Sequence, residues 1–261
     1  MDLNLQDKVI IVTGGSKGIG FGIATTLAEE GAIPVIIGRQ ESDVLKAVRS
    51  LTENGGKAAY AIAELTDPDQ CKMAVEKVVA EFGRIDGLVN NAGVNDGIGL
   101  ENGNHKDFIR SLERNVVHYY MMAQLVLPFL KKNKGAAIVN IGSKTSLTGQ
   151  GGTSGYAAAN GGRNALTREW AVELLPYSIR VNAVLVAECY TPLYDRWIKT
   201  FDNSEEKLAA ITAKIPLENR MTTAQELGDT VAFLLSSKSS HTTGQLLFVD
   251  GGYTHLDRAL S

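Results

Sequence analysis

The chain has 261 residues and a mass of 28.0 kDa, which is enough for one large domain with a substantial buried core. Its net charge of -3 and its isoelectric point near 5.9 argue against nucleic acid or an anionic membrane as the main partner. The two cysteines, Cys71 and Cys189, and the four histidines show no metal-binding spacing, so we expect no catalytic metal and no structural disulfide.

The first residues lack the apolar core of a signal peptide. No apolar run approaches the roughly 18 residues that a membrane-spanning helix needs. We therefore expect a cytoplasmic protein.

Short apolar runs rich in β-branched residues recur along the chain, with helical patterns between most of them. They lie at residues 9–12, 33–37, 58–62, 87–89, 136–141, 179–184 and 246–249. This alternation predicts an α/β fold: a single-domain, doubly wound parallel sheet of about seven strands with helices on both faces. No linker interrupts the pattern, so we expect one domain over residues 1–261. Ligands of such a sheet lie beyond the carboxyl ends of its strands.

The first run breaks into a glycine-rich turn, Gly14-Gly-Ser-Lys-Gly-Ile-Gly20, and a helical pattern begins directly after it. Such glycines let the backbone come close to a pyrophosphate, and the N–H groups that open the helix bind its negative charge. A glycine-rich run is also common as an ordinary turn. Its place between a strand and a helix favours a dinucleotide site.

Several polar residues then fall near predicted strand ends or interrupt helical segments. Asn90-Asn-Ala-Gly93 follows the fourth run, Asn115 interrupts a helical pattern, and Ser143 follows the fifth run. Tyr156 and Asn160 are four residues apart in Ser154-Gly-Tyr-Ala-Ala-Ala-Asn160, so they share one face of a helix.

In this order, the motifs resemble those of the classical short-chain dehydrogenase/reductase family over essentially the whole chain. The resemblance rests on residues 13–20, 90–93, 115, 143, 156, 180–183 and 250–252. It implies a Rossmann fold and an oxidoreductase that uses a nicotinamide cofactor. It also implies that Ser143 binds the substrate oxygen, Tyr156 carries the proton and Asn115 holds a water of a proton relay.

The chain departs from the family at Asn160, where the resemblance leads us to expect a lysine. In the family this lysine holds the nicotinamide ribose, and its charge favours the tyrosine phenolate. An amide can keep the hydrogen bond, but it lacks the charge, which is worth roughly 3 kcal/mol at about 5 Å and an effective dielectric constant near 20. Two cations, Lys144 and Arg163, could supply the missing charge. Otherwise Asn160 marks a natural or engineered site with reduced activity.

The resemblance implies a set of cofactor-binding residues: Gly14, Ser16, Lys17, Ile19, Gly20, Arg39, Glu64, Leu65, Asn91, Ala92, Gly93, Tyr156, Asn160, Cys189 and Thr191. Gly38 stands where NAD-preferring relatives often carry an acidic residue. Lys17 and Arg39 could meet a 2'-phosphate, so we favour NADP(H) and keep NAD(H) as the alternative. Glu64-Leu65 stands where the family often has an Asp-Val pair that binds adenine.

A substrate flap is expected at about residues 186–216, although an ordinary pair of surface helices is the alternative. The expected substrate residues are Ser143, Lys144, Gln150, Glu188 and Trp197. Lys144, Gln150 and Glu188 would form a polar wall that suits a polyol better than an apolar ligand. Lys144 and Glu188 could instead form a salt bridge outside the pocket.

This combination is similar to bacterial sugar dehydrogenases of the L-fucose dehydrogenase kind, which implies oxidation of an aldose such as L-fucose to its lactone. One alternative is a carbonyl reductase for an oxoacyl or keto-acid substrate. The other is a dinucleotide binder without activity.

The resemblance also implies a homotetramer. Its contacts would involve the helix that carries Met121, Met122, Val126 and Leu127, the helix at residues 156–175 and the apolar C-terminal tail through Leu260.

Overall fold

A computed structural model describes residues 2–256 of the chain, and its centre is a seven-stranded sheet. The strand order is β3-β2-β1-β4-β5-β6-β7, and every neighbouring pair is parallel. The strands are β1 Val9–Thr13, β2 Ile33–Gly38, β3 Ala59–Ile62, β4 Gly87–Asn90, β5 Ala137–Ser143, β6 Arg180–Val186 and β7 Leu246–Val249. The doubly wound sheet expected from the sequence is confirmed.

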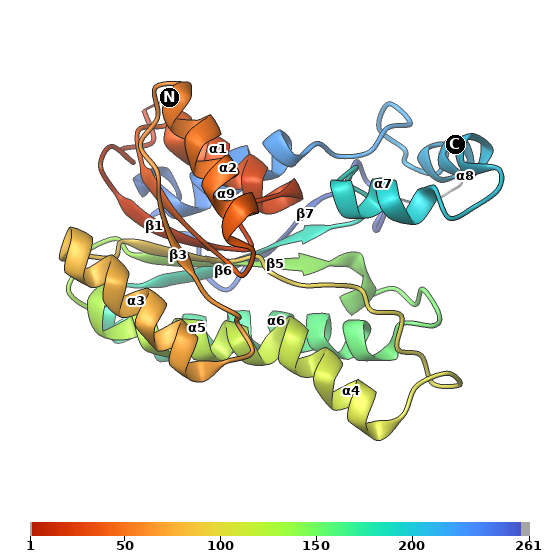
Figure 1. Cartoon of the computed structure of the whole chain (residues 1–261), viewed down its shortest axis with the longest axis horizontal. Coiled ribbons are helices and arrows are strands. Elements are labelled where there is room, and N and C mark those ends of the chain that lie inside the picture. Colours follow the sequence, from red (N-terminus) through yellow and green to blue (C-terminus); the bar gives the residue numbers. More distant parts are fainter. Residues whose placement is uncertain (1, 257–261) are drawn as a thin grey trace.

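Helices cover both faces of this sheet (Figure 1). On one face lie α1 Gly18–Glu29, α2 Glu41–Glu53 and α9 Ala224–Leu235, and on the other lie α3 Pro68–Phe82, α5 His118–Leu130 and α6 Ser154–Glu173. Helix α4, His105–Leu112, continues into a π-helical turn, Glu113–Val117, directly before α5. Short 3-10 turns lie at Lys144–Ser146, Leu175–Tyr177 and Ser237–Ser239.

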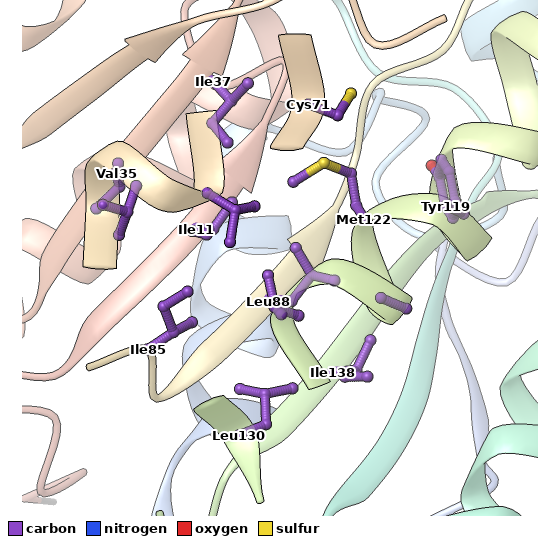
Figure 2. Packing of buried hydrophobic residues seen from close by; sticks show 14 of the residues in the cluster. Ile11, Val35, Ile37, Cys71, Ile85, Leu88, Tyr119, Met122, Leu130 and Ile138 are labelled. Atoms are coloured by element: carbon purple, nitrogen blue, oxygen red, sulfur yellow. The ribbon is translucent and has the colours of Figure 1, made fainter. Parts of the chain in front are cut away.

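The strands are apolar at consecutive positions because both of their faces are buried. Ile11 of β1 packs with Leu88 of β4 and Ile138 of β5 in the cluster under α3, α5 and α6 (Figure 2). Ile10 and Val12, the neighbours of Ile11 in β1, belong to a second cluster under α1 and α9. Burial on both faces leaves the strand ends as the place for polar chemistry.

The expected subunit contact through α5 is partly wrong. Met122 and Val126 have no exposed surface and pack inside the protomer, because this side of α5 faces the sheet. The tetramer stays a prediction. Part of the apolar tail expected to join that contact, residues 257–261, lies outside the described residues.

Strands β1 and β4 lie side by side at the centre of the sheet, although the chain first leaves β1 toward β2. The crossovers therefore run in opposite directions from this point, which opens a crevice at the carboxyl ends of the strands. The amide Nδ2 of Asn91 donates to the carbonyl oxygen of Thr13 at 2.9 Å, and the backbone N–H of Asn91 donates to Thr13 Oγ1 at 2.9 Å. These bonds tie the two strand ends together.

The segment expected as a flap follows β6 and contains two short helices, α7 Pro192–Ile198 and α8 Ser204–Thr212. Both project beyond the carboxyl ends of the strands (Figure 1). Strand β5 is longer than expected and includes Ser143, because its pairing with β6 continues as far as Val186. Within residues 2–256, no helix is both long and apolar enough to cross a membrane.

Candidate functional site

The glycine turn between β1 and α1 has the backbone of a phosphate cradle. Gly14 and Gly18 have φ angles of +65° and +56°, which residues with a side chain rarely adopt. A Cβ on Gly20 would lie 2.3 Å from the carbonyl oxygen of Gly14. No side chain caps the start of α1, so its first N–H groups remain available to an anion. These features fit the pyrophosphate of a dinucleotide, with Ile19 and Gly20 in the first turn of the helix.

The start of the flap lies against this turn. A Cβ on Gly18 would lie 3.2 Å from Thr191 Cβ, and Thr191 caps α7 by accepting a hydrogen bond from the backbone N–H of Tyr194 at 3.2 Å. Thr191 therefore lies where a cofactor contact was expected. Cys189 is different, because its side chain is buried in the core and burial raises the pKa of its thiol to about 12. A cofactor contact at Cys189 would have to come from its main chain.

The two cations expected near the adenosine ribose both form ion pairs. Lys17 Nζ lies 2.6 Å from Asp43, and Arg39 Nη1 lies 3.3 Å from Glu64. Burial raises the pKa of Glu64, but hydrogen bonds from Thr66 and Arg39 lower it to a net value below the usual range. These pairs are largely exposed, so each is worth little and can open for a ligand.

The other residues near the turn and β4 occupy defined places. Ser16 Oγ lies 3.8 Å from the point where a Cβ on Gly38 would stand. The Leu65 side chain is buried in the core, which leaves its main chain for a ligand. Ala92 packs against Gly14, since a Cβ on Gly14 would lie 3.1 Å from Ala92 Cβ.

Asn115 lies in the π-helical turn before α5 and has no exposed surface. Its Oδ1 accepts a hydrogen bond from the backbone N–H of Val94 at 2.8 Å, and its Nδ2 donates to the carbonyl oxygen of Ser111 at 2.9 Å. A π turn inserts one residue into a helix and often occurs at functional sites. Here it turns the Asn115 amide toward the segment after β4.

Ser143 and Tyr156 lie on adjacent elements. Ser143 ends β5, and its Oγ accepts a hydrogen bond from the backbone N–H of Thr145 at 3.3 Å. Tyr156 is half-buried in the first turn of α6. The preceding Gly155 allows α6 to pack closely on α4, because a Cβ there would lie 2.6 Å from Ser111 Oγ. This close contact fixes where α6, and with it Tyr156, begins.

Asn160 is fully buried one turn after Tyr156. Its Nδ2 donates to the carbonyl oxygen of Tyr156 at 2.9 Å, and its Oδ1 accepts a hydrogen bond from Arg163 Nη1 at 3.1 Å. The guanidinium of Arg163 also contacts Asn115, with Nη2 3.4 Å from Asn115 Oδ1. From the sequence, Arg163 was one of two cations that could replace the charge of the missing lysine. The structure places its guanidinium in contact with both Asn115 and Asn160.

Lys144 and Glu188 form the salt bridge that the sequence left open, and both side chains are largely buried. The pair stands where β5 and β6 end, with Lys144 directly after Ser143. Lys144 Nζ also lies 3.9 Å from the centre of the Tyr253 ring. The hydroxyl of Tyr194 is buried beside Glu188, but the two side chains are not aligned for a well-formed hydrogen bond. Burial first, and then the charge of Glu188, raise the pKa of Tyr194.

The other two expected substrate residues lie farther out. Gln150 is exposed on a loop that lines a hollow of about 280 Å³, and it forms no hydrogen bond to Lys144 or Glu188 in the described structure. Trp197 is 44% exposed on α7 and meets Tyr194 edge to face, with ring centres 5.1 Å apart. Lys144, Glu188 and Tyr194 thus lie together, and Gln150, which was expected to join Lys144 and Glu188, forms no hydrogen bond with them in the described part of the chain.

The comparison with protein families finds a match over residues 14–254 to the model described as enoyl-(acyl carrier protein) reductase. The chain belongs to the short-chain dehydrogenase/reductase family. It is an oxidoreductase of that family, which uses nicotinamide cofactors.

Individual relatives differ in what they act on. A 3-oxoacyl-[acyl-carrier-protein] reductase from Thermotoga maritima is 33% identical, over 96% of this chain and 99% of the relative. The solved structure of Cj0485 dehydrogenase is 45% identical, with a TM-score of 0.94 and coverage of 100% of this chain and 99% of that chain. The structure of L-sorbose reductase from Gluconobacter frateurii, complexed with NADPH and L-sorbose, is 27% identical, with a TM-score of 0.94. The match covers 98% of this chain and 100% of that chain.

The sequence reasoning missed Tyr194 and Tyr253 as neighbours of the Lys144–Glu188 pair. The only signal was the presence of aromatic residues in the flap and after β7, which does not tell a pocket residue from a packed one.

In residues 2–256, no three histidine, cysteine, aspartate or glutamate side chains gather as metal ligands.

His118 follows the π turn and is almost fully buried. Its Nε2 lies 3.0 Å from the carbonyl oxygen of Arg114, so this nitrogen carries the proton, while Nδ1 has no partner among the described residues. Burial first, and then the charge of Arg163, lower the pKa of His118 to about 4. The imidazole is therefore neutral at neutral pH.

His118 is predicted to make the fold acid-sensitive. Between the unfolded pKa of about 6.5 and the folded pKa of about 4, the unfolded chain binds one more proton. Stability is therefore lost as the pH falls through this window, by about 3 kcal/mol from this group. Urea unfolding at pH 7 and pH 4.5 should show a smaller loss for His118→Gln than for the parent. His241 is exposed, so His241→Gln should lose as much stability as the parent between the two pH values. An equal loss of stability in all three proteins would show that His118 is not the acid-sensitive group.

Proposed function

We propose that this protein oxidises a small polyhydroxylated alcohol with NAD(P)+, and that the substrate is an aldose, such as L-fucose, which is converted to its lactone. The observation that carries the proposal is the buried Lys144–Glu188 pair beside Ser143, together with the buried hydroxyl of Tyr194 next to Glu188. An apolar substrate would leave these groups without new partners in a largely buried place. A sugar presents hydroxyls that both donate and accept hydrogen bonds, so it matches all three.

The reacting hydroxyl would lie between Ser143 and Tyr156. Ser143 donates a hydrogen bond to the substrate oxygen and holds it in place. Tyr156 takes the proton of the hydroxyl, which allows a neutral carbonyl to form. When bound, the nicotinamide accepts the hydride from the substrate carbon. Asn115 would hold a water that extends this proton path.

The L-sorbose reductase neighbour supports a sugar substrate, because its structure was obtained with L-sorbose and NADPH. The 3-oxoacyl reductase relative supports the second candidate, reduction of an oxoacyl or keto-acid carbonyl. The Lys144–Glu188 pair favours the sugar, since a carboxylate in the wall is unsuited to an anionic or acyl substrate.

We further propose that NADP(H) is preferred over NAD(H). Arg39 directly follows β2, Lys17 reaches Asp43 in the first turn of α2, and no acidic residue occupies position 38. Their present partners, Asp43 and Glu64, are held in partly exposed pairs. A 2'-phosphate would offer each cation a more highly charged acceptor.

The proposal predicts turnover with sugars. Initial rates of NADP+ and NAD+ reduction over a panel of aldoses that includes L-fucose should show activity. Because Tyr156→Phe removes the proton acceptor, it should lower kcat on the order of a hundredfold or more. A parallel assay with NADPH and 3-oxoacyl or keto-acid substrates covers the second candidate. Activity confined to those carbonyl compounds would reject the sugar assignment.

Tyr194→Phe is predicted to weaken sugar binding without harming the fold. The variant removes a hydroxyl that forms no well-aligned hydrogen bond among residues 2–256 and has only Glu188 close by, so thermal stability should change little. The KM for the aldose should rise about tenfold, since one hydrogen bond to the sugar is lost. Tyr190→Phe is the matched control, because its hydroxyl is exposed and bonded to Asp195. Equal KM values for both variants would remove Tyr194 from the pocket.

The cofactor proposal predicts a selective effect. Lys17→Ala and Arg39→Ala should each raise the KM for NADP+ by about tenfold, because each loses a charge-assisted hydrogen bond to the 2'-phosphate. The KM for NAD+ should change little and provides the internal control. Equal changes for both cofactors would show that these cations do not select the phosphate.

A further inference from the structure

Arg163 is a buried cation without a counter-charge among residues 2–256. It is 3% exposed, and none of the salt bridges in this part of the chain includes it. Its guanidinium donates only to neutral oxygens: Nε to the carbonyl of Asn115 at 2.6 Å, and Nη1 to the carbonyl of Ile141 at 3.0 Å and to Asn160 Oδ1 at 3.1 Å. Burying a charge without an opposite charge is costly, so its retention calls for a function.

The surroundings of Arg163 are shaped to admit the guanidinium. A Cβ on Gly93 would lie 2.7 Å from Arg163 Nη2, so the glycine leaves the necessary space. The Tyr119 ring lies under the guanidinium, with its centre 4.3 Å from Cζ. Tyr119 Oη also donates to the carbonyl oxygen of Ile141, at 3.0 Å. These contacts hold the positive charge at one place.

The guanidinium touches elements that carry the residues assigned to proton transfer. Tyr156 and Arg163 are seven residues apart, hence on the same face of α6, and helical side chains point back toward the N-terminus. The guanidinium accordingly reaches Asn160, whose amide is bonded to the Tyr156 carbonyl. Its other contacts are Asn115 and the strand that ends in Ser143. Lys144 is instead held by Glu188.

We propose that Arg163 is a positioning residue for proton transfer: its fixed charge stabilises the ionised, proton-accepting form of Tyr156, and its hydrogen bonds orient Asn115 and Asn160. The role rests on the proposed function, in which Tyr156 accepts the substrate proton. It supplies a positive charge to a site where Asn160 has none.

The ionisation of Tyr156 can be distinguished from that of the other titratable groups near Arg163. They are His118 and Tyr119 from α5, Lys144 from the turn after β5, Asp96, which is bonded to Ser111, and Glu113 and Arg114, which are exposed on the π turn. The pKa of His118 is lowered to about 4, and burial raises the pKa of Tyr119 above the ordinary tyrosine range. Subtracting the tyrosinate absorbance of the Tyr156→Phe variant leaves the ionisation of Tyr156 alone.

The test is an ultraviolet titration of tyrosinate in the full chain without substrate, as the difference between each protein and its Tyr156→Phe counterpart. Circular dichroism limits the comparison to pH values at which both proteins are folded. Arg163→Gln, which keeps an amide donor but no charge, should move the ionisation of Tyr156 upward by at least about one pH unit. The low-pH limb of the kcat/KM profile should move with it.

Asn160→Lys/Arg163→Gln returns one cation to the site and should bring the ionisation of Tyr156 back to the parent pH or below. A lower melting temperature in Arg163→Gln with unchanged Tyr156 ionisation would mean a structural role only and would overturn the proposal. If Arg163→Gln does not fold, Arg163→Met takes its place in the titration: a rise in the pH at which Tyr156 ionises supports the proposal, and an unchanged pH or a second failure to fold overturns it. The titration needs no turnover, so it separates this proposal from a failure of the sugar assignment.

Discussion

The parallel pairing of β1 with β4 is the constraint on which the rest of the site depends. It places the end of β1 beside the end of β4, and the bonds between Thr13 and Asn91 lock the two ends together. Because the chain leaves these strands in opposite directions, the crevice between their crossovers remains open. The glycine turn, the segment after β4 and Ser143 all reach this edge. Weakening the pairing would separate the glycine turn from Ser143 and Tyr156.

A second requirement comes from burial on both faces of the sheet, since any polar group inside must find its partner inside. Asn90 Nδ2 donates to Asn140 Oδ1 at 3.1 Å, and Asn140 Nδ2 donates to Thr167 Oγ1 at 2.9 Å. Thr167 then donates to the carbonyl oxygen of Arg163 at 2.8 Å. This chain of bonds connects β4 and β5 to α6. Helix α6, which carries Tyr156 and Asn160, is thereby fixed to the strands that carry the remaining site residues.

The two buried cations near the site have different surroundings. Lys144 is paired with a carboxylate at the mouth of the strands, where a polar ligand can share the pair. Arg163 is surrounded by neutral oxygens and an aromatic ring, so its positive charge is not cancelled locally. In a medium of low dielectric constant, such a charge acts strongly on a neighbouring group that can become an anion. The first cation suits recognition of a substrate, and the second suits control of a proton.

The sequence by itself determined the succession of strands and helices along the chain and the glycine turn at Gly14 to Gly20, and it indicated Ser143, Tyr156 and Asn115 as candidate site residues. These features follow from local periodicity, from glycines in a short turn and from motif order, all of which can be observed along the chain. Only the tertiary structure decided that Lys144 meets Glu188, 44 residues away, and that Arg163 lies between Asn115 and Asn160. It also turned Met122 and Val126 toward the core and placed the Tyr194 hydroxyl beside Glu188. Such outcomes depend on how separate elements pack and on which neutral or charged groups meet after burial, and no local pattern contains that information.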